Sequence, residues 1–431
     1  MITQSELQSE QLAHWKPRFF SIWTGQALSM IGSALTQFVL IWWIAETTGS
    51  ASALALAGIM ALLPTALFGP LGGALADRWS RRVVMIVADA VTAVCMVILV
   101  ALFATGAVQI WHVYTLMFLR ATMQAFQGPA AMASTPNLVP PEWLTRVAGM
   151  NQAMQGVLTI AAAPLGALAL AFLPLQGALM IDVVTALLGI VPLLVYRIPQ
   201  PPPSATKTGN SVLADIREGA RYVAQRRGLL ILYATVGLVV LTVLPTFSLT
   251  PLLVTQHFAG GVNEVALMEG LAGMGIIVGG VVVSLRTWTD RRIRLVMLSF
   301  AVSCGMVALT ALAPANLLWL AVFWWTISGF SFSTGNAPMM AILQMTVPNE
   351  LQGRAFSLLN MVFGLAGPVG LALAGPIAEA FGVRMLFILG GSLSALTCVA
   401  AYLMSPALRA IETAHAPTKK AAPFGSTVAA D

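Results

Sequence analysis

The chain has 431 residues, of which 58% are hydrophobic and only 9% are charged, and its mean hydropathy is +0.85. Soluble domains carry about 25% charged residues, so this chain has too few polar residues to cover a water-facing surface of its size. The composition therefore excludes a soluble globular protein and indicates a membrane protein with many spans.

Twelve hydrophobic runs follow one another along the chain, and each is long enough to cross a bilayer as a helix of about 20 residues. They cover 19–44, 52–76, 83–104, 110–134, 149–172, 175–196, 229–256, 264–285, 293–313, 316–341, 355–378 and 383–405. The first run is too long for the hydrophobic region of a signal peptide. We therefore expect it to remain in the protein as its first span.

The basic residues predict how these spans are oriented. If every odd-numbered connection is outside, all of the 22 lysines and arginines except Arg120 and Arg384 fall in cytoplasmic segments. Cytoplasmic loops carry such an excess of basic residues, so both termini are predicted to be cytoplasmic and the protein to be a multi-pass protein of the cell membrane. The net charge of +6 reflects this asymmetry beside an anionic leaflet, and no nucleic-acid partner is expected.

A long polar connection divides the runs into six and six. It opens with prolines, and its second part places apolar residues at helical spacing with charges between them, which predicts an amphipathic helix on the membrane surface. The predicted organisation is a cytoplasmic tail over 1–18, a six-helix half over 19–196, a cytoplasmic linker with the amphipathic helix over 197–228, a second six-helix half over 229–405 and a disordered cytoplasmic tail over 406–431.

The two halves resemble each other in sequence. Val139, Pro140, Glu142 and Arg146, which follow the fourth run, recur at a constant spacing after the tenth run as a second Val, Pro, Glu and Arg set over 347–354. Such repeats in a twelve-span chain indicate halves related by a pseudo-twofold axis along the membrane normal. The predicted fold class is an all-α polytopic membrane protein with twelve transmembrane helices in two pseudo-symmetric six-helix halves.

A basic segment, GALADRWSRR over 73–82, joins the second and third runs. A carboxylate at a helix end can pair with arginines and with a helix N-terminus, so we expect this segment to latch the halves together in one conformation. The predicted latch residues are Gly73, Asp77, Arg78, Arg81, Arg82 and Asp89. The alternative is that the arginines only anchor the loop at the membrane surface.

Arg120 lies well inside the fourth run, where a charge costs at least about 2.5–3.5 kcal/mol. It must face the interior, a cavity or an acidic partner, and the intramembrane acids are Asp89, Asp182 and Glu269. We favour Asp182 and Glu269 as groups whose protonation opens and closes a pair with Arg120, which would couple protons to conformation. The alternative is a purely structural ion pair.

Further residues are candidates for a substrate cavity and for helix kinks. Aromatic, amide and methionine side chains suit an amphipathic substrate, and the cavity candidates are Trp23, Gln26, Gln37, Met123, Gln124, Trp324 and Trp325. Proline removes a helical hydrogen bond, and the kink candidates are Pro164, Gly166, Gly367 and Pro368. The alternative for both sets is ordinary helix packing.

The sequence offers no support for a cofactor or for covalent chemistry. The histidines are scattered without metal-ligand spacing, the three cysteines fall in separate apolar runs, and a phosphate-binding loop of the Gly-x-x-x-x-Gly-Lys-Ser/Thr type is missing. We therefore expect neither an enzyme, nor a metal, nor a bound cofactor.

The motifs resemble those of the major facilitator superfamily. Gly73, Asp77, Arg78, Arg81 and Arg82 match its loop signature, with Trp79 and Ser80 as a mild departure, and Arg120, Gln124 and Gly128 match its fourth-span signature. The segments over 127–131, 136–140 and 142–146 resemble the drug:proton antiporter branch, which includes macrolide-efflux and siderophore-export proteins. Ala163 stands where the antiporter signature has glycine before proline.

This resemblance implies a proton-coupled exporter of a small amphipathic compound that works by alternating access, with protons, the substrate and the bilayer as its partners. We expect it to act as a monomer. The alternatives are an importer or uniporter of a small metabolite and a membrane sensor of the same fold that does not transport.

Overall fold

The computed structural model of the chain describes residues 15–198, 212–285 and 292–413, and within these ranges it contains α-helices and short 3-10 turns but no strand. The α-helices are α2 (Trp15–Thr48), α3 (Ala51–Arg78), α4 (Arg81–Ala104), α5 (Ile110–Ser134), α6 (Leu144–Phe172), α7 (Leu175–Val195), α8 (Val212–Gln225), α9 (Arg227–Phe258), α10 (Val262–Leu285), α11 (Arg292–Leu312), α12 (Leu318–Thr346), α13 (Asn349–Phe381), α14 (Val383–Met404) and α15 (Pro406–Thr413). Two 3-10 turns, η1 (Thr135–Asn137) and η2 (Pro141–Trp143), lie between α5 and α6.

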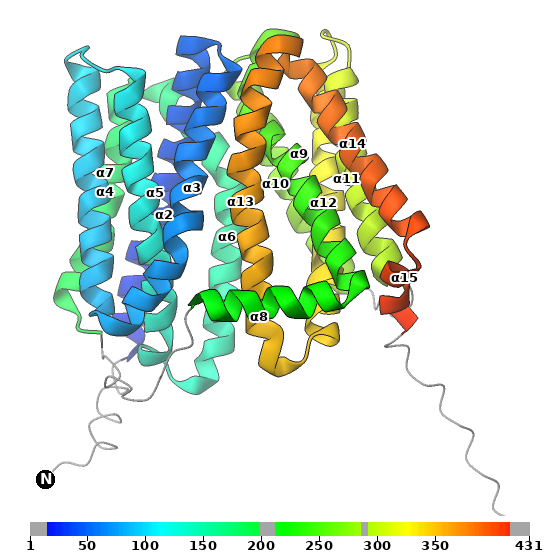
Figure 1. Cartoon of the computed structure of the whole chain (residues 1–431). Helices are drawn as coiled ribbons and strands as arrows, with labels where there is room; N and C mark the ends of the chain where they lie inside the picture. Colours follow the sequence, from blue (N-terminus) through cyan, green and yellow to red (C-terminus); the bar gives the residue numbers. More distant parts are fainter. Residues whose placement is uncertain (1–14, 199–211, 286–291, 414–431) are drawn as a thin grey trace, which may run out of the picture.

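Twelve of these helices run side by side as two groups of six, α2 to α7 and α9 to α14 (Figure 1). Ten of the described helices are long and apolar enough to cross a membrane by length and composition alone. The other two long helices, α5 and α12, pack among them but contain more polar residues, such as Arg120 and Gln124 in α5 and a series of serines and threonines in α12. The predicted fold class is confirmed.

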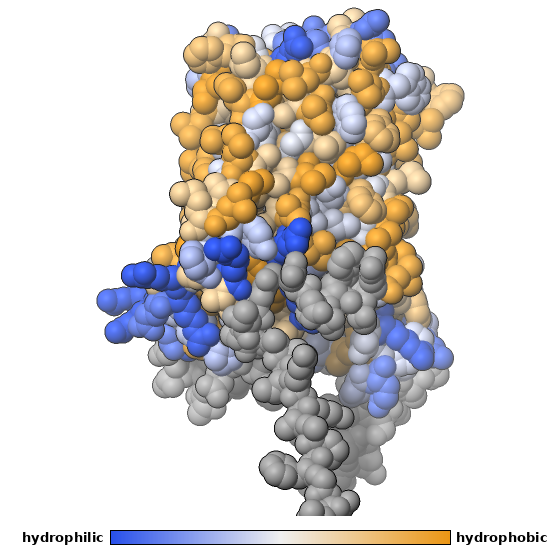
Figure 2. Space-filling view, turned by 90° about the vertical axis from the view of Figure 1, so that its right-hand side faces the viewer, coloured by the Kyte–Doolittle hydropathy of each residue, from blue (hydrophilic) through white to orange (hydrophobic). Residues whose placement is uncertain are grey.

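On the face of the bundle shown in Figure 2, the surface is mostly apolar along its middle, and hydrophilic residues gather near its two ends. Large hydrophobic side chains that point outward are exposed along most of the long helices, for example Leu194 at 57% and Leu396 at 66%. An exposed apolar surface of this extent fits contact with lipid acyl chains rather than water.

Helix α8 lies across one end of the bundle (Figure 1), over residues for which a short amphipathic helix is predicted. It is attached to the second group of helices: Glu218 forms an ion pair with Arg354 of α13 at 2.6 Å, and the Tyr222 hydroxyl donates to the Thr346 carbonyl at 3.3 Å. We call this end of the bundle the α8 end and the other end the distal end.

The chain continues beyond the last long helix as α15, a helix of eight residues. The prediction of a disordered tail from residue 406 is wrong for this segment, because Leu408 is fully buried and Ala407 lies against Gly228 at the start of α9. The remainder of that tail, 414–431, and the 1–14 part of the predicted N-terminal tail lie outside the described residues.

Helices α3 and α13 bring the two groups into contact, but only over part of their length. A Cβ atom built on Gly375 would lie 3.0 Å from Ser52 near the distal end, and one built on Gly364 would lie 3.1 Å from Ala66 near the middle. Further toward the α8 end, a Cβ atom built on Gly73 would have no neighbour within 4 Å in the part of the chain that the structure describes. The two helices therefore diverge toward the α8 end.

Helices α6 and α10 make the matching contact on the other side of the molecule. The Cγ atom of Pro164 lies 2.9 Å from a Cβ atom built on Gly270, and the Ile160 backbone lies at the same distance from one built on Gly273. Nearer to the α8 end, a Cβ atom built on Gly149 would have no neighbour within 4 Å over residues 15–198, 212–285 and 292–413. Both contacts between the groups are thus closed toward the distal end and open toward the α8 end.

A polar contact joins the groups at the distal end itself. The Ser50 hydroxyl donates to Glu379 Oε1 of α13 at 2.6 Å, and the Ser52 backbone N–H donates to the same oxygen at 3.2 Å. Ser50 also caps α3, because its hydroxyl accepts from the Ala53 N–H at 3.2 Å. A carboxylate at a helix N-terminus is favoured by the helix dipole, so this contact stabilises the closed distal end.

Candidate functional site

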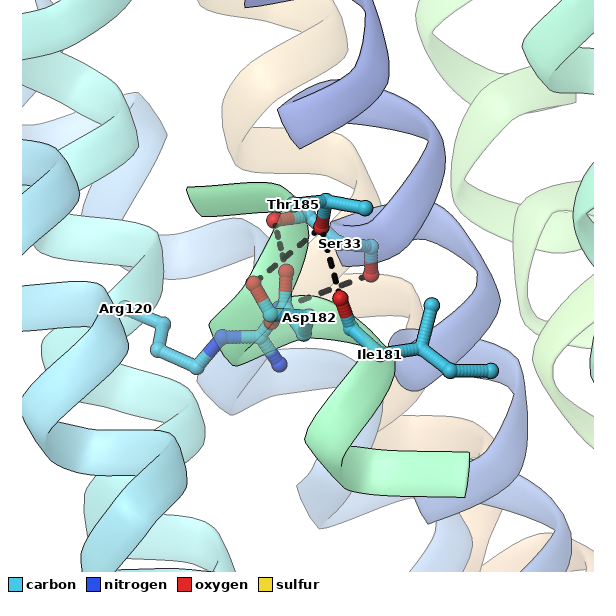
Figure 3. A network of polar contacts seen from close by, with 5 residues as sticks. All are labelled: Ser33, Arg120, Ile181, Asp182 and Thr185. Atoms are coloured by element: carbon cyan, nitrogen blue, oxygen red, sulfur yellow. Dashed lines mark hydrogen bonds and ion pairs between the residues drawn. The ribbon is translucent and has the colours of Figure 1, made fainter. Parts of the chain in front are cut away.

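An ion pair is buried inside the first group of helices. Arg120 of α5 and Asp182 of α7 approach to 2.9 Å between Nη2 and Oδ2, and their side chains are 4% and 0% exposed. Figure 3 shows the arginine reaching across from its own helix to Asp182. Of the three acids proposed as partners of Arg120, the structure pairs it with Asp182.

Helix α2 supplies the third member of this site. The Ser33 hydroxyl donates to Asp182 Oδ1 at 2.9 Å, and Arg120 Nη2 donates to the Ser33 carbonyl at 3.4 Å (Figure 3). Gly32 allows α2 to approach this closely, since a Cβ atom there would lie 2.0 Å from the Thr185 hydroxyl oxygen of α7. We call Ser33, Arg120 and Asp182 the ion-pair site.

The arginine of this site is only partly satisfied. Its Nε and Nη1 atoms are buried without a hydrogen-bond partner among the described residues. A guanidinium has five N–H donors, and each buried donor left unpaired costs about 1–3 kcal/mol. Arg120 therefore has donors available for a second acceptor, such as a carboxylate, a carbonyl or water.

A second polar cluster surrounds Asp89 of α4, which is 3% exposed. Gln26 Nε2 of α2 donates to Asp89 Oδ2 at 2.8 Å, and Gln127 Nε2 of α5 donates to Asp89 Oδ1 at 2.5 Å. The amides are also joined to each other at 2.9 Å, and Gln26 reaches the Gly189 carbonyl of α7 at 3.3 Å. We call Asp89, Gln26 and Gln127 the amide site.

Glu269, the third acid, lies on α10 in the other group. No hydrogen bond or ion pair of Glu269 is found within the described part of the chain. By helical register it shares a face with Ile276 and Gly280, turned away from the exposed Met274 and Val278. Glu269 therefore faces the interior but is not brought together with Arg120 in this conformation.

The basic pair of the predicted latch binds helix ends. Arg81 Nη1 donates to the Ala133 carbonyl at the end of α5, and Arg82 donates to the Leu193 and Leu194 carbonyls at the end of α7. Terminal carbonyls of a helix lack partners within it and carry partial negative charge. The arginines thus hold the α8 ends of α5 and α7 to the start of α4.

The other predicted latch residues are placed differently. Asp89 belongs to the buried amide site, about two turns further into the bundle, and a Cβ atom built on Gly73 would have no neighbour within 4 Å among the described residues. The side chains of Asp77 and Arg78 lie outside what the structure describes. The side chains that can be described therefore do not test a latch between the two groups, which stays a prediction.

Replacing Arg82 with alanine is expected to lower the stability of the protein, because two terminal carbonyls of α7 lose a charged donor. Hydrogen bonds to charged groups contribute about 1.5–3 kcal/mol each, so a clear fall in the melting temperature of the detergent-solubilised protein is expected. The exposed Arg197, changed to alanine, is the control. Equal melting temperatures for Arg82→Ala and wild type would show that the cap contributes nothing.

The cavity candidates divide into several environments. Trp23 Nε1 donates to Asn151 Oδ1 of α6 at 2.8 Å, whereas Gln26 is occupied by the amide site. Gln124 is exposed, while Gln37, Met123 and Trp324 are half-buried. Trp325 does not line an open space in this conformation, because it is 1% exposed and packs between Phe247 and Phe387.

The kink candidates lie at close contacts between helices. A Cβ atom on Gly166 would lie 2.4 Å from the Phe38 ring of α2, and one on Gly367 would lie 2.6 Å from Leu244 of α9. Pro164 packs on Gly270, and Pro368 is buried. Helices α6 and α13 continue through these prolines, so close packing accounts for both glycines.

Three polar residues of these sites were not singled out from the sequence. Ser33, Gln127 and Asn151 all bind candidate residues from another helix. One signal was available, since Gln127 follows Arg120 by seven residues, a spacing that places both on one face of α5. Serine and asparagine in an apolar run carry no comparable signal.

Comparison with known proteins agrees with this architecture. The family model described as Major Facilitator Superfamily matches residues 22–371 and 287–428. Macrolide efflux protein A of Streptococcus pyogenes is 31% identical over 391 residues, which cover 91% of this chain and 96% of that protein. The multidrug efflux pump Tap of Mycolicibacterium fortuitum is 27% identical over 404 residues, covering 90% and 95% of the two chains.

A solved structure shows the same fold at low identity. The nucleoside transporter NupG superposes with a TM-score of 0.66 at 13% identity, over 88% of this chain and 98% of that one. The family match, the efflux relatives and the bundle of membrane-spanning helices confirm the resemblance drawn from the motifs, and they indicate transport rather than catalysis. The chain is a membrane transporter that belongs to the Major Facilitator Superfamily.

Proposed function

We propose that this transporter exports a small amphipathic molecule from the cell in exchange for protons, acting as a monomer. The observation that carries the proposal is the buried Arg120–Asp182 pair, which lies inside a bundle that is closed at one end and open at the other. The names of the efflux relatives support the direction of transport.

The distribution of charge supports a cytoplasmic position for the α8 end. Arg82, Arg146, Arg226 and Arg354 lie at that end, whereas Arg384 stands near the distal end with its Nε atom bound to the Ala311 carbonyl. By the positive-inside rule the α8 end and both termini face the cytoplasm. The conformation described above is then inward-open.

Proton coupling would act through the ion-pair site. A protonated Asp182 carries no charge and holds Arg120 less strongly, so the guanidinium, which already has two unpaired nitrogens, can turn to another acceptor. Ser33 of α2 binds the same carboxyl group and would move with it. Protonation thereby changes the packing of α2, α5 and α7, which biases the equilibrium between the two open states.

The substrate would enter between the groups from the cytoplasm. Gln152, Gln155 and Thr159 are polar and exposed on α6, although this helix crosses the membrane. Gln155 and Thr159 share the stripe of α6 that meets α2 at Gly166 nearer to the distal end. Gln155 and Thr159 therefore face the inner opening rather than lipid. Together with Trp23 they would bind a molecule that has both apolar and polar parts.

The test is transport in proteoliposomes of known orientation. A radiolabelled macrolide and a panel of amphipathic cations are supplied with and without an imposed pH gradient, and protein-free liposomes serve for background. Export is expected to require a proton gradient directed opposite to the movement of the substrate. If the substrate is instead taken up together with protons along an inward proton gradient, the protein is a symporter and not an exporter. If transport does not depend on the gradient, proton coupling is rejected.

The distal contact makes a separate prediction about conformation. Replacing Glu379 with alanine removes the acceptor for Ser50 and for the Ser52 N–H, so the outward-open state is expected to become more populated. Spin labels on the exposed Thr47 and Ala380 would report longer distances. Glu46→Ala, another exposed acid at this end, is the control, and unchanged distances in Glu379→Ala would mean that the contact does not bias the equilibrium.

A further inference from the structure

We propose that Asp89 is a second proton-carrying group of this transporter, placed between Asp182 and the cytoplasm and positioned by Gln26 and Gln127. The inference rests on the proposed proton coupling at the ion-pair site. It gives Asp89 a role different from that of the cytoplasmic latch predicted from the sequence.

The carboxyl group of Asp89 is held by donors from two other helices. Each of its oxygens accepts a hydrogen bond from a glutamine amide, at 2.8 Å from Gln26 and 2.5 Å from Gln127. An amide nitrogen can only donate, so this arrangement fits a charged carboxylate. A proton on Asp89 would need one glutamine to turn its carbonyl oxygen toward the acid.

That rearrangement would not stay local. Gln26 and Gln127 are bonded to each other, and Gln26 is also bonded to the Gly189 carbonyl of α7. Loss or reversal of one amide therefore affects α2, α5 and α7 together. These are the same three helices that supply Ser33, Arg120 and Asp182 to the ion-pair site.

The two sites are in register. Gln26 precedes Ser33, Gln127 follows Arg120 and Gly189 follows Asp182 by seven residues each, which is two helical turns, or about 10.5 Å along the axis. The amide site is the one nearer to the α8 end on all three helices. It therefore lies between the ion-pair site and the cytoplasmic opening.

Polar side chains continue between the two levels. Ser29 of α2 and Thr92 of α4 are 5% and 8% exposed, and each lies three residues beyond a member of the amide site, in the direction of the ion-pair site. Hydroxyl groups both donate and accept, so they can pass a proton, with or without water.

Few other charges face Asp89. Helix α5 contributes Arg120 and α7 contributes Asp182, while α2 has no charged residue between 19 and 45 and α4 has none other than Asp89 between 83 and 104. A charge on Asp89 is therefore sensed mainly by the ion-pair site. A charge on one of these two carboxylates disfavours a charge on the other, so protonation of either group depends on the state of its neighbour.

The test compares net transport with exchange. In proteoliposomes, Asp89→Asn is expected to keep substrate–substrate counterflow, which moves no net proton, and to lose most proton-driven transport and most of the proton flux seen with an entrapped pH dye. Asp89→Glu should restore part of both. Wild-type proton flux and pH dependence in Asp89→Asn would overturn the proposal, while loss of counterflow as well would assign Asp89 a structural role.

Two further measurements keep the outcomes distinct. Gln127→Met retains Asp89 but removes one donor, so the pH profile of transport should change while counterflow remains; an unchanged profile would contradict the role given to the amide site. If Asp182→Asn abolishes proton-driven transport but Asp89→Asn does not, only the present inference fails. If transport by the wild-type protein does not depend on the pH gradient, both this inference and the proposed proton coupling fail.

Discussion

Replacing Arg120 with leucine is expected to destabilise the transporter severely, whereas the double variant Arg120→Leu/Asp182→Leu regains stability without regaining proton-driven transport. The single change leaves the fully buried Asp182 carboxylate without its cation. Breaking a buried pair in this way costs about 3–5 kcal/mol, while replacing both partners with apolar residues of similar volume is often neutral or stabilising. The pair is thus expected to be retained for coupling rather than for stability.

The melting temperature and the transport rate of the detergent-purified and reconstituted variants would separate these effects. Asp182→Asn should behave differently again, since its amide can still bind Arg120 and Ser33 but cannot release a proton. Arg146→Leu, at an exposed position, is the control for loss of a basic residue. A double variant that transports with wild-type dependence on the pH gradient would reject Arg120 and Asp182 as the coupling pair.

The sequence was sufficient to predict that Arg120 needs an internal partner, but not which acid provides it. Its cost inside the membrane follows from charge and depth alone. The choice among Asp89, Asp182 and Glu269 depends on which helices are neighbours, and this became visible only when α5 and α7 were placed around α2. The prediction of twelve spans, in contrast, depends only on local hydropathy, which can be calculated from each stretch of the sequence by itself.

The binding partners of the basic loop also could not be predicted from the sequence. Arg81 and Arg82 bind backbone carbonyls at Ala133 and at Leu193, far along the chain. Backbone acceptors are the same for every residue type, so no side-chain pattern marks them. The loop signature predicts basic residues at a membrane surface, and only the packing of α4, α5 and α7 shows which backbone groups Arg81 and Arg82 bind.

The surroundings of Trp325 and the presence of α15 could not be predicted, because burial against distant segments cannot be read from a local stretch of sequence. Trp325 was predicted to line a cavity from its depth in its span, but aromatic neighbours on α9 and α14 enclose it. The first residues after the last span were predicted to be disordered from their composition, but Leu408 packs into the bundle. In each case a tertiary contact decided the outcome.

A bulky residue at Gly73 or Gly149 is expected to abolish transport while leaving the protein folded. A Cβ atom added at either position would have no neighbouring atom within 4 Å among the described residues of this conformation, so Gly73→Phe and Gly149→Phe should melt near the wild-type temperature. In the outward-open state the diverging parts of α3 and α13, and of α6 and α10, must come together. Added side-chain volume in a packed contact costs about 1–3 kcal/mol or more, which would trap the protein inward-open.

The two positions test alternating access from opposite sides of the molecule, because Gly73 faces the α3–α13 contact and Gly149 faces the α6–α10 contact. Gly305→Phe is the matched control, since a Cβ atom on Gly305 would also have no described atom within 4 Å, but Gly305 belongs to α11, which takes no part in either contact. Substrate binding from the inside should survive in all three variants, whereas transport should survive only in the control. Wild-type transport by Gly73→Phe and Gly149→Phe would mean that the inner ends never close, and a rocking exchange between the two groups of helices would have to be abandoned.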